Sequence, residues 1–304
     1  MSDMTKFLLD SGDPKEYEEI ARLAKEHGSE LWGSTTNPTL IAKKLTGKKV
    51  SKGKAFQLQK EIVLEILDIV PGAVSSEVYA DESTKAEEMI QQGREISAWH
   101  KRVVVKLPTT IEGFIARTQL RKEYIPINNT LVFSQPQIFA IYLHERIIQQ
   151  TYGPIDNLWP PFISPFVGRL DDISENGMDL VENGLKLLKQ FSLELPRLWM
   201  LEASVRNINH IKRGIQLHSE LITAPAKIYR EWFRISKEER EKPVQEAPSL
   251  KRIEYWNPSE KIKRIATMEN FIGAIREGVL DITHPLTEKG IQRFADDWKA
   301  IITT

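Results

Sequence analysis

Lys106 ends a short apolar run and is the first candidate for chemistry. It follows three valines, residues 103–105, and precedes Leu107 and Pro108, a pattern typical of the end of a buried strand. If Lys106 has no catalytic role, its flexible side chain extends from the strand end and its ammonium is solvated by water. In the functional interpretation, it stays poorly solvated, gives up its proton more readily and attacks a carbonyl as a neutral amine. The iminium so formed withdraws electrons, so that a neighbouring carbon–carbon bond can break.

Such a cycle also needs a carboxylate to take and return protons, and a polar group to hold water. Asp10 and Glu77 each fall late in an apolar run and can fill these roles. Alternatively, either one caps the following helix or pairs with a lysine. For Asp10 this alternative is weaker, because Asp13, followed by Pro14, already has the pattern of a helix N-cap.

Arg169 and Arg206 are candidates for binding a phosphate. Guanidinium groups are always charged and can bind a phosphate through two parallel hydrogen bonds. Alternatively, these arginines form ion pairs with Asp171, Asp172 or Glu202.

Similar polar residues stand where other apolar runs give way to loops. Any soluble barrel places polar residues at such points, so their chemical mixture is more informative than any one of them. These positions are Asp10, Thr35 with Asn37, Glu77, Lys106, Asn128 with Thr130, Ser164 with Arg169, and Ser204 with Arg206.

Eight short apolar runs alternate with amphipathic, helix-like segments, which predicts parallel strands joined by crossover helices. Eight such units that close on themselves form an α/β fold, the (β/α)8 TIM barrel, whose active site lies at the carboxyl ends of the strands. An open doubly wound sheet is the alternative, but no G-x-G-x-x-G motif follows the first strand. The predicted strands are residues 7–10, 31–35, 73–79, 103–107, 125–133, 162–167, 198–205 and 221–223.

We predict one β/α-barrel domain over residues 1–304, with a core of about 5–225 and a C-terminal helical extension of about 226–304. Two segments exceed a minimal barrel. Residues 145–161 lengthen the fifth crossover, and the region after Tyr229 contains a charged run (237–242) and a proline-flanked stretch (248–258) that read as a surface excursion. Either segment can cover the site mouth, change acceptor preference or form a subunit contact. The predicted helices are residues 17–25, 56–70, 83–96, 111–122, 135–150, 178–193, 208–218, 267–276 and 290–302.

Composition excludes several classes of protein. The chain has 42 basic and 42 acidic residues, so no global basic field favours nucleic acid or an anionic membrane as a partner. It has no cysteine, which excludes a disulfide framework, a thiolate zinc site and a cysteine nucleophile. The six histidines show no metal-ligand spacing, so we expect no metal and disfavour a zinc-dependent aldolase. No signal-peptide pattern and no membrane-length apolar run occurs, so we expect a cytoplasmic protein.

Six blocks resemble those of the transaldolase family, in the family's order. Each alone is moderately specific, and together they span residues from about 5 to 225. The blocks are FLLDSGD (7–13), TTNPTL (35–40), VVKLP (104–108), NTLVFS (129–134), SPFVGRLDD (164–172) and ASVRN (203–207).

The resemblance implies a β/α barrel that uses no cofactor and transfers a dihydroxyacetone unit between sugar phosphates, in the pentose phosphate pathway. It implies that Lys106 forms the Schiff base and that Asp10 removes a proton from the donor's C4 hydroxyl. Glu77 with Thr130 would hold the catalytic water. The remaining implied roles are hydroxyl binding by Asn37, Asn128 and Ser164 with Thr35 lining the site, and phosphate binding by Arg169, Ser204 and Arg206.

The same family contains fructose-6-phosphate aldolases, which release free dihydroxyacetone. The pattern that those aldolases resemble has glutamine at the position of Glu77 and tyrosine at the position of Phe166. A tyrosine hydroxyl can protonate the enamine and release the product, whereas phenylalanine cannot, so both positions favour the transferase. The alternatives are an aldolase of the same fold and a non-catalytic sugar-phosphate binding protein. Oligomeric state is left open.

Overall fold

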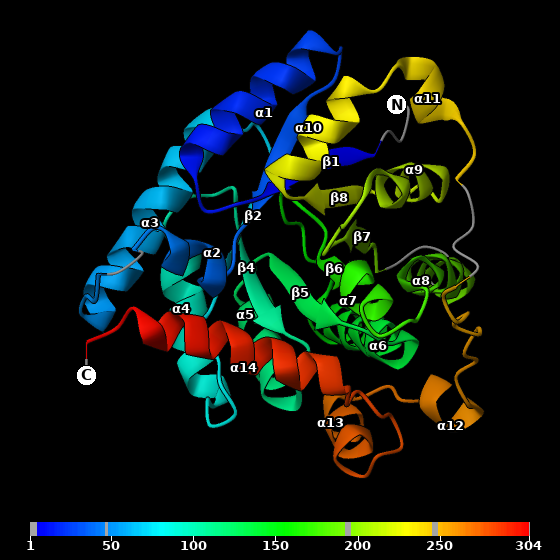
Figure 1. The fold of residues 1–304 in the computed structure, drawn as a ribbon. Coiled ribbons are helices and arrows are strands. Elements are labelled where there is room, and N and C mark those ends of the chain that lie inside the picture. The colour runs from blue at the N-terminus through cyan, green and yellow to red at the C-terminus, as the bar shows by residue number, and fades with distance from the viewer. Residues whose placement is uncertain (1–4, 46–47, 192–195, 245–248, 304) are drawn as a thin grey trace.

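Eight parallel strands close into a barrel in the computed structural model, in the order β1 to β8 (Figure 1), which confirms the predicted TIM-barrel fold. The structure describes residues 5–45, 48–191, 196–244 and 249–303. The strands are β1 (Lys6–Asp10), β2 (Leu31–Thr35), β3 (Val74–Glu77), β4 (Val103–Pro108), β5 (Ile127–Val132), β6 (Phe162–Pro165), β7 (Trp199–Glu202) and β8 (Leu221–Ala224).

The apolar strand β4 shows why Lys106 points into the barrel. Successive side chains of a strand point to opposite faces, so Val103 and Val105 share one face, and Val104 and Lys106 share the other. Val105 faces the helices, because its side chain lies 3.4 Å from where a Cβ on Gly93 would stand. Lys106 therefore points inward from a strand that is buried along its whole length.

Each strand is followed by a helix that covers the outside of the barrel, as expected for crossover connections. The predicted helices agree with these to within a few residues, and residues 192 and 193 of one prediction lie outside the described residues. The crossover helices are α1 (Pro14–Glu26), α3 (Lys52–Ile69), α4 (Ala86–Ser97), α5 (Ile111–Lys122), α6 (Gln135–Tyr152), α8 (Gly177–Phe191) and α9 (Ile208–Gln216), and α10 (Ala226–Arg234) follows β8.

Two short helices that we did not predict follow β2 and β6 directly. These are α2 (Pro38–Lys43) and α7 (Val167–Asp171), which are too short to show a helical period. They lie on the side of the barrel where the strands end. They carry Lys43 and Arg169 toward the site.

Among the described residues after α10, part of the predicted surface excursion packs on the barrel. The charged run forms α11 (Lys237–Glu241), all of it outside the core. Residues 249–258 pack on the barrel helices, since the backbone N–H of Ile253 donates to Asp179 and Trp256 lies edge-on to Phe139 at 5.8 Å. Pro248 lies outside the described residues. The chain continues through α12 (Glu260–Lys263) and α13 (Met268–Arg276).

Helix α14 (Pro285–Ala300) runs across the carboxyl end of the barrel (Figure 1). At its beginning, the Thr287 hydroxyl donates to the carbonyl of Leu131 at 2.9 Å. Further along, the hydroxyl of Thr39 contacts Asp297. These contacts fix α14 over the strand ends, and so the C-terminal region forms one wall of the site.

The last part of the fifth crossover lies at the opposite end of the barrel from the site. Helix α6 ends at Tyr152, and residues 153–161 lead into the beginning of β6. Trp159 in this segment packs on Trp32 at 4.9 Å and on Trp199 at 6.3 Å. Because these contacts are near the amino ends of the strands, residues 153–161 cannot cover the mouth of the site.

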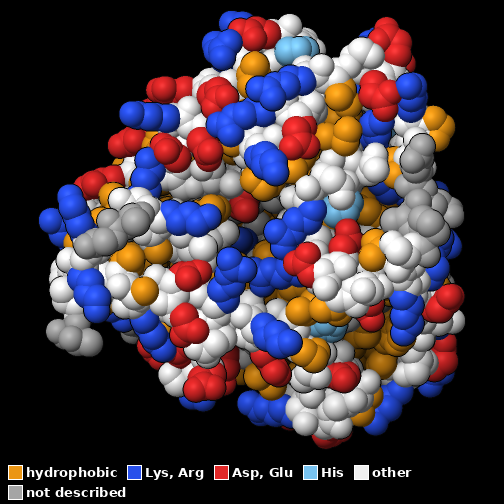
Figure 2. Space-filling view, in the orientation of Figure 1, with side chains coloured by type: hydrophobic (Ala, Val, Ile, Leu, Met, Phe, Trp, Pro, Cys, Tyr) orange, Lys and Arg blue, Asp and Glu red, His pale blue; other side chains and the backbone are white. Residues whose placement is uncertain are grey.

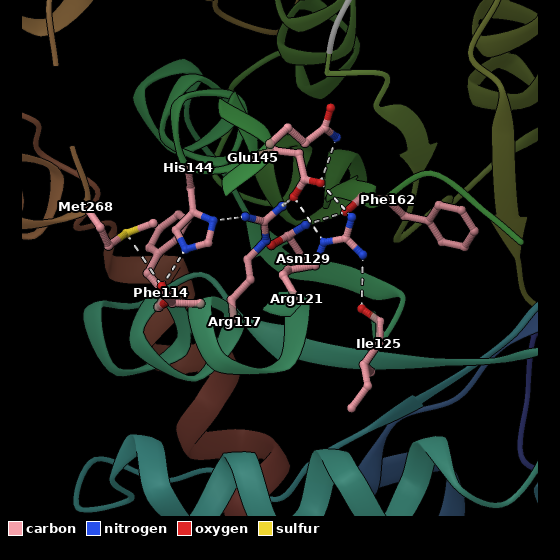
Figure 3. Close-up of polar contacts among 11 residues, drawn as sticks. Phe114, Arg117, Arg121, Ile125, Asn129, His144, Glu145, Phe162 and Met268 are labelled. Atoms are coloured by element: carbon pink, nitrogen blue, oxygen red, sulfur yellow. Dashed lines mark hydrogen bonds and ion pairs between the residues drawn. The ribbon is translucent and has the colours of Figure 1, made fainter. Parts of the chain in front are cut away.

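A buried cluster of charges joins α5 to α6 (Figure 3). The Glu145 carboxylate accepts hydrogen bonds from Arg117 at 2.7 Å and from Arg121 at 2.6 and 3.1 Å, and all three side chains are at most 1% exposed. His144 contacts Arg117, and its ring packs on Phe271 of α13 at 5.5 Å. The cluster therefore also forms part of the surface on which the C-terminal region packs.

In the described parts of the chain, no helix is long and apolar enough to cross a membrane.

Candidate active site

Lys106 and Glu77 form a buried ion pair at the carboxyl end of the barrel. The two residues are register partners on neighbouring strands, and the Lys106 Nζ lies 2.9 Å from Glu77 Oε2. Lys106 is only 3% exposed, so its side chain does not extend to bulk water. Its Nζ also donates to the carbonyl oxygen of Thr36 at 3.2 Å. Glu77 thus pairs with a lysine, as one interpretation of the sequence expected, and that lysine is the candidate nucleophile itself.

Two aromatic rings cover this ammonium. The centroids of Phe166 and Phe294 each lie 6.0 Å from Lys106 Nζ. Phe166 follows β6, whereas Phe294 comes from α14, far away in sequence. The rings limit the number of waters that can solvate the lysine. The ammonium lies next to Glu77. Burial raises the pKa of Glu77, and the charge of Lys106 partly offsets this rise.

Asp10 stands in the same cavity as Lys106, on the strand that closes the barrel. The Thr35 hydroxyl donates to Asp10 Oδ1 at 2.8 Å and lies 2.7 Å from the Thr223 hydroxyl. Burial raises the pKa of Asp10, and the charge of Lys106 and the hydrogen bond from Thr35 partly offset this rise. A carboxylate with a raised proton affinity at a polar floor can act as a general base.

A chain of amide and hydroxyl groups lines the interior beside Lys106. Ser164 donates to the Asn128 side-chain oxygen at 2.6 Å, and the Asn128 amide donates to Ser75 at 3.1 Å. Thr130 lies two residues further along the same face of β5, fully buried. Its hydroxyl has no hydrogen-bond partner among the described residues, so it can bind a small polar group there.

The two candidate phosphate-binding arginines differ in their surroundings. Arg169 is stacked between the rings of Phe166 and Phe294, at 5.1 and 5.3 Å, and burial lowers its pKa. Arg206 forms the ion pair that one interpretation expected, with Asp172 at 2.9 Å, but both side chains are at least half exposed. Such an exposed pair contributes little stability and can open for a ligand. Ser204 adopts a positive φ of 60°, in the turn that leads to Arg206.

A cavity of about 230 Å³ connects most of the predicted residues. Asn37 lines it while its side-chain oxygen caps α2 by accepting from the N–H of Leu40 at 3.0 Å. Figure 2 shows Lys and Arg side chains around a hollow on this face. The predicted residues that line the cavity are Asp10, Thr35, Asn37, Lys106, Ser164, Phe166, Arg169, Ser204 and Arg206, whereas Glu77, Asn128 and Thr130 lie beside it.

The lining also includes residues that were not predicted to belong to the site, among them Lys43, Arg293 and Phe294. Lys43 ends the unpredicted helix α2, and the other two lie on α14. Phe294 begins the sequence FADDW (294–298), which is not one of the six blocks described above. No strand-end argument could place it, because α14 reaches the site by tertiary packing.

The site contains the parts of an amine-based catalyst. It joins a buried lysine to a carboxylate, adds a second carboxylate at the cavity floor, and places cationic side chains at the mouth. Among the residues that the structure describes, no group of three or more His, Asp or Glu residues lies close enough to hold a metal ion.

Comparisons with known proteins show the family to which the chain belongs. The family model described as Transaldolase/Fructose-6-phosphate aldolase matches residues 7–304. The chain is 30% identical to a probable transaldolase of Brevibacillus brevis, over 97% of this chain and 99% of that protein. It is 32% identical to a probable transaldolase of Aquifex aeolicus and 29% identical to one of Thermoanaerobacter sp., each over 97% of both chains.

Proposed function

The chain belongs to the transaldolase/fructose-6-phosphate aldolase family, and from that premise we propose that it is a transaldolase. In this proposal it transfers a dihydroxyacetone unit from sedoheptulose 7-phosphate or fructose 6-phosphate to glyceraldehyde 3-phosphate or erythrose 4-phosphate. The observation that carries the proposal is the buried Lys106, which lies 2.9 Å from Glu77 in a site that also holds Asp10.

The reaction begins when Lys106 transfers a proton to Glu77 and attacks the C2 carbonyl of the ketose. The carbinolamine then loses its hydroxyl as water, with a proton supplied through Glu77, and becomes an iminium. Thr130 and Glu77 would bind that water and return it at the end of the cycle. The raised pKa of Glu77 suits a group that alternates between its acid and base forms.

Asp10 would then remove the proton from the C4 hydroxyl. The C3–C4 bond breaks, its electron pair moves into the iminium to give an enamine, and an aldose phosphate leaves. An incoming aldehyde reverses these steps. Asn37, Asn128, Ser164 and Thr35 would orient the hydroxyls of the bound unit.

The phosphate would lie at the cationic mouth, against Arg169, Ser204 and Arg206. Arg169 is held by two aromatic rings, so it needs little reordering when a phosphate arrives. Arg206 would exchange Asp172 for the phosphate.

Phe166, whose ring lies over the Lys106 ammonium, favours transfer of the dihydroxyacetone unit to an acceptor over its release. Phe166 lies over the ammonium and carries no hydroxyl, so it cannot protonate the enamine carbon. The enamine then persists until an aldehyde acceptor binds. An aldolase that releases free dihydroxyacetone would need a proton donor at this point.

Borohydride reduction in the presence of fructose 6-phosphate tests the lysine, and mapping of the labelled peptide locates it. We expect a stable adduct on Lys106, and none in Lys106→Met, whereas the matched exposed-lysine variant Lys101→Met keeps it. An adduct at another residue, or none, refutes the mechanism. Turnover of fructose 6-phosphate that does not depend on added erythrose 4-phosphate would identify the aldolase instead.

We also propose that residues 1–304 act as one domain. Helix α13 packs on α5 and α6, and α14 contributes Phe294 to the cavity of the barrel. The C-terminal region is therefore needed for the complete site.

A further inference from the structure

A second cavity reaches Glu77 from the outside of the barrel. It has a volume of about 480 Å³, opens between α3 and α4, and is bordered by Trp298 of α14. Glu77 lines this second cavity, whereas Lys106 lines the sugar-phosphate cavity described above. Glu77, which lines the second cavity, thus contacts Lys106, which lines the first, at 2.9 Å.

The two cavities carry opposite charge. The sugar-phosphate cavity is lined by Lys43, Lys106, Arg169, Arg206 and Arg293 and by a single carboxylate, that of Asp10. It attracts anionic substrates.

In the second cavity the balance is reversed. Glu77, Glu88 and Glu95 line it with one cation, Lys52, and four of the nine remaining lining residues are glutamines. Such a lining repels a sugar phosphate and provides many hydrogen-bonding groups for water.

Hydrogen bonds hold the inner wall of the second cavity in place. Gln59 donates to the carbonyl of Glu77 and to the hydroxyl of Ser76, each at 2.9 Å. Gln92 accepts from the N–H of Tyr79 at 2.8 Å and donates to its carbonyl at 3.3 Å. These side-chain contacts fix the backbone on both sides of Glu77, so that the wall does not collapse onto the strand end.

We propose that the second cavity is a solvent passage that carries water and protons to and from Glu77. The inference rests on the proposed Schiff-base function, in which the ketone oxygen leaves as water when the iminium forms and a water oxygen returns when it is hydrolysed. A bound sugar phosphate fills the first cavity and places its phosphate at the cationic mouth. Water then reaches the iminium along the acidic passage, without passing the substrate.

An introduced thiol at the passage entrance tests this, because the chain has no cysteine of its own. Gln91→Cys and Gly53→Cys place single thiols on α4 and α3, on opposite sides of the entrance. A Cβ at Gly53 meets no atom within 4 Å, so that variant should fold normally. Each folded protein is then modified with a methyl or a benzyl methanethiosulfonate. Lys237→Cys, at an 82% exposed side chain on α11, is the matched control.

The measurement is the exchange of the C2 oxygen of saturating fructose 6-phosphate with oxygen-18 water, corrected for the uncatalysed rate. We expect the benzyl group at position 91 or 53 to slow the exchange several-fold. The methyl group at these positions, and either group at position 237, should leave it unchanged. Competitive inhibition by inorganic phosphate should stay the same, which shows that the first cavity is intact.

Equal exchange rates in the benzyl- and methyl-modified proteins overturn the passage, provided that the unmodified variants still form the Lys106 adduct. A reduced affinity for phosphate in the benzyl forms also overturns it, since the block would then act on the substrate cavity. Loss of the adduct in the unmodified wild type would instead refute the proposed function itself.

Discussion

Replacing Glu145 with glutamine should strongly destabilise the fold, although Glu145 lies outside the active site. The carboxylate is 0% exposed and accepts three hydrogen bonds from two guanidinium groups, with a fourth from Gln149 at 3.1 Å (Figure 3). In Glu145→Gln the guanidinium groups of Arg117 and Arg121 stay buried without a counter-charge. Removing one partner of a buried ion pair typically costs about 3–5 kcal/mol.

The titration of Glu145 gives a second measure of the same interaction. The neighbouring guanidinium groups of Arg117 and Arg121 outweigh burial and lower the pKa of Glu145 from 4.5 to about 2. At about 1.36 kcal/mol for each tenfold change in proton affinity, this corresponds to about 3 kcal/mol. Because the folded-state pKa is the lower one, this stability is present above pH 4.5 and is lost as the pH falls toward 2.

Urea denaturation at pH 7, followed by both tryptophan fluorescence and circular dichroism, measures the effect. Coincident transitions show whether the two-state assumption holds for a chain of this size. Glu182→Gln is the matched control, because Glu182 pairs with Arg213 at 2.6 Å but its side chain is 38% exposed. It should cost less than about 1 kcal/mol.

A loss of less than about 1 kcal/mol in Glu145→Gln would refute the reasoning, since it would mean that the two arginines find other partners or water. Replacing Arg117, Arg121 and Glu145 together by apolar residues of similar volume should restore most of the stability, because no buried charge then remains.

Three further predictions concern titration and the fate of the intermediate. Glu202 is fully buried, its carboxylate oxygens have no hydrogen-bond partner among the described residues, and burial raises its pKa well above 4.5. The free energy of unfolding should therefore fall as the pH rises above 4.5. Glu202→Gln should remove this slope, measured as urea midpoints between pH 5 and 8. Thr35→Val removes a hydrogen bond that lowers the pKa of Asp10. The acid limb of the pH profile of kcat/KM should therefore shift to higher pH by about one unit. A limb that does not shift would exclude Asp10 as the base. In the absence of an acceptor, Phe166→Tyr should increase the rate at which free dihydroxyacetone is released by on the order of tenfold, because tyrosine can protonate the enamine. A coupled assay measures the release. An unchanged rate would show that Phe166 does not retain the intermediate.

Much of the barrel was predictable because its strands are buried on both faces. A strand such as β4 reads as a continuous apolar run, and short runs with helices between them leave few topologies open. Lys106 stood out for the same reason, as one charge in such a run. Its position next to Glu77 depends on strand register, which pairs these two residues across β3 and β4. The sequence order of the strands made that pairing a reasonable expectation, but the 2.9 Å contact required the structure.

What could not be predicted comes from elements that reach the strand ends by tertiary packing. Phe294 lies 188 positions after Lys106 in the sequence, and no local pattern relates the two. The same holds for Arg293, and for the wall that Trp298 adds to the second cavity. The position of residues 153–161, by contrast, could have been predicted, because a segment between a helix and the next strand lies where the strands begin.

The two cavities also change how the central lysine is understood. From the sequence, the chemistry of Lys106 depended on whether its ammonium was poorly solvated, a property of a single residue. In the structure, the ammonium is enclosed by Phe166 and Phe294 on the substrate side and paired with Glu77 on the other. In the proposed Schiff-base cycle, the two rings would protect the enamine on the substrate side, while the proposed passage would supply water on the carboxylate side. An enzyme that must both expel water and take it up again in one cycle is served by such a separation, and Glu77 is the residue at which the two sides meet.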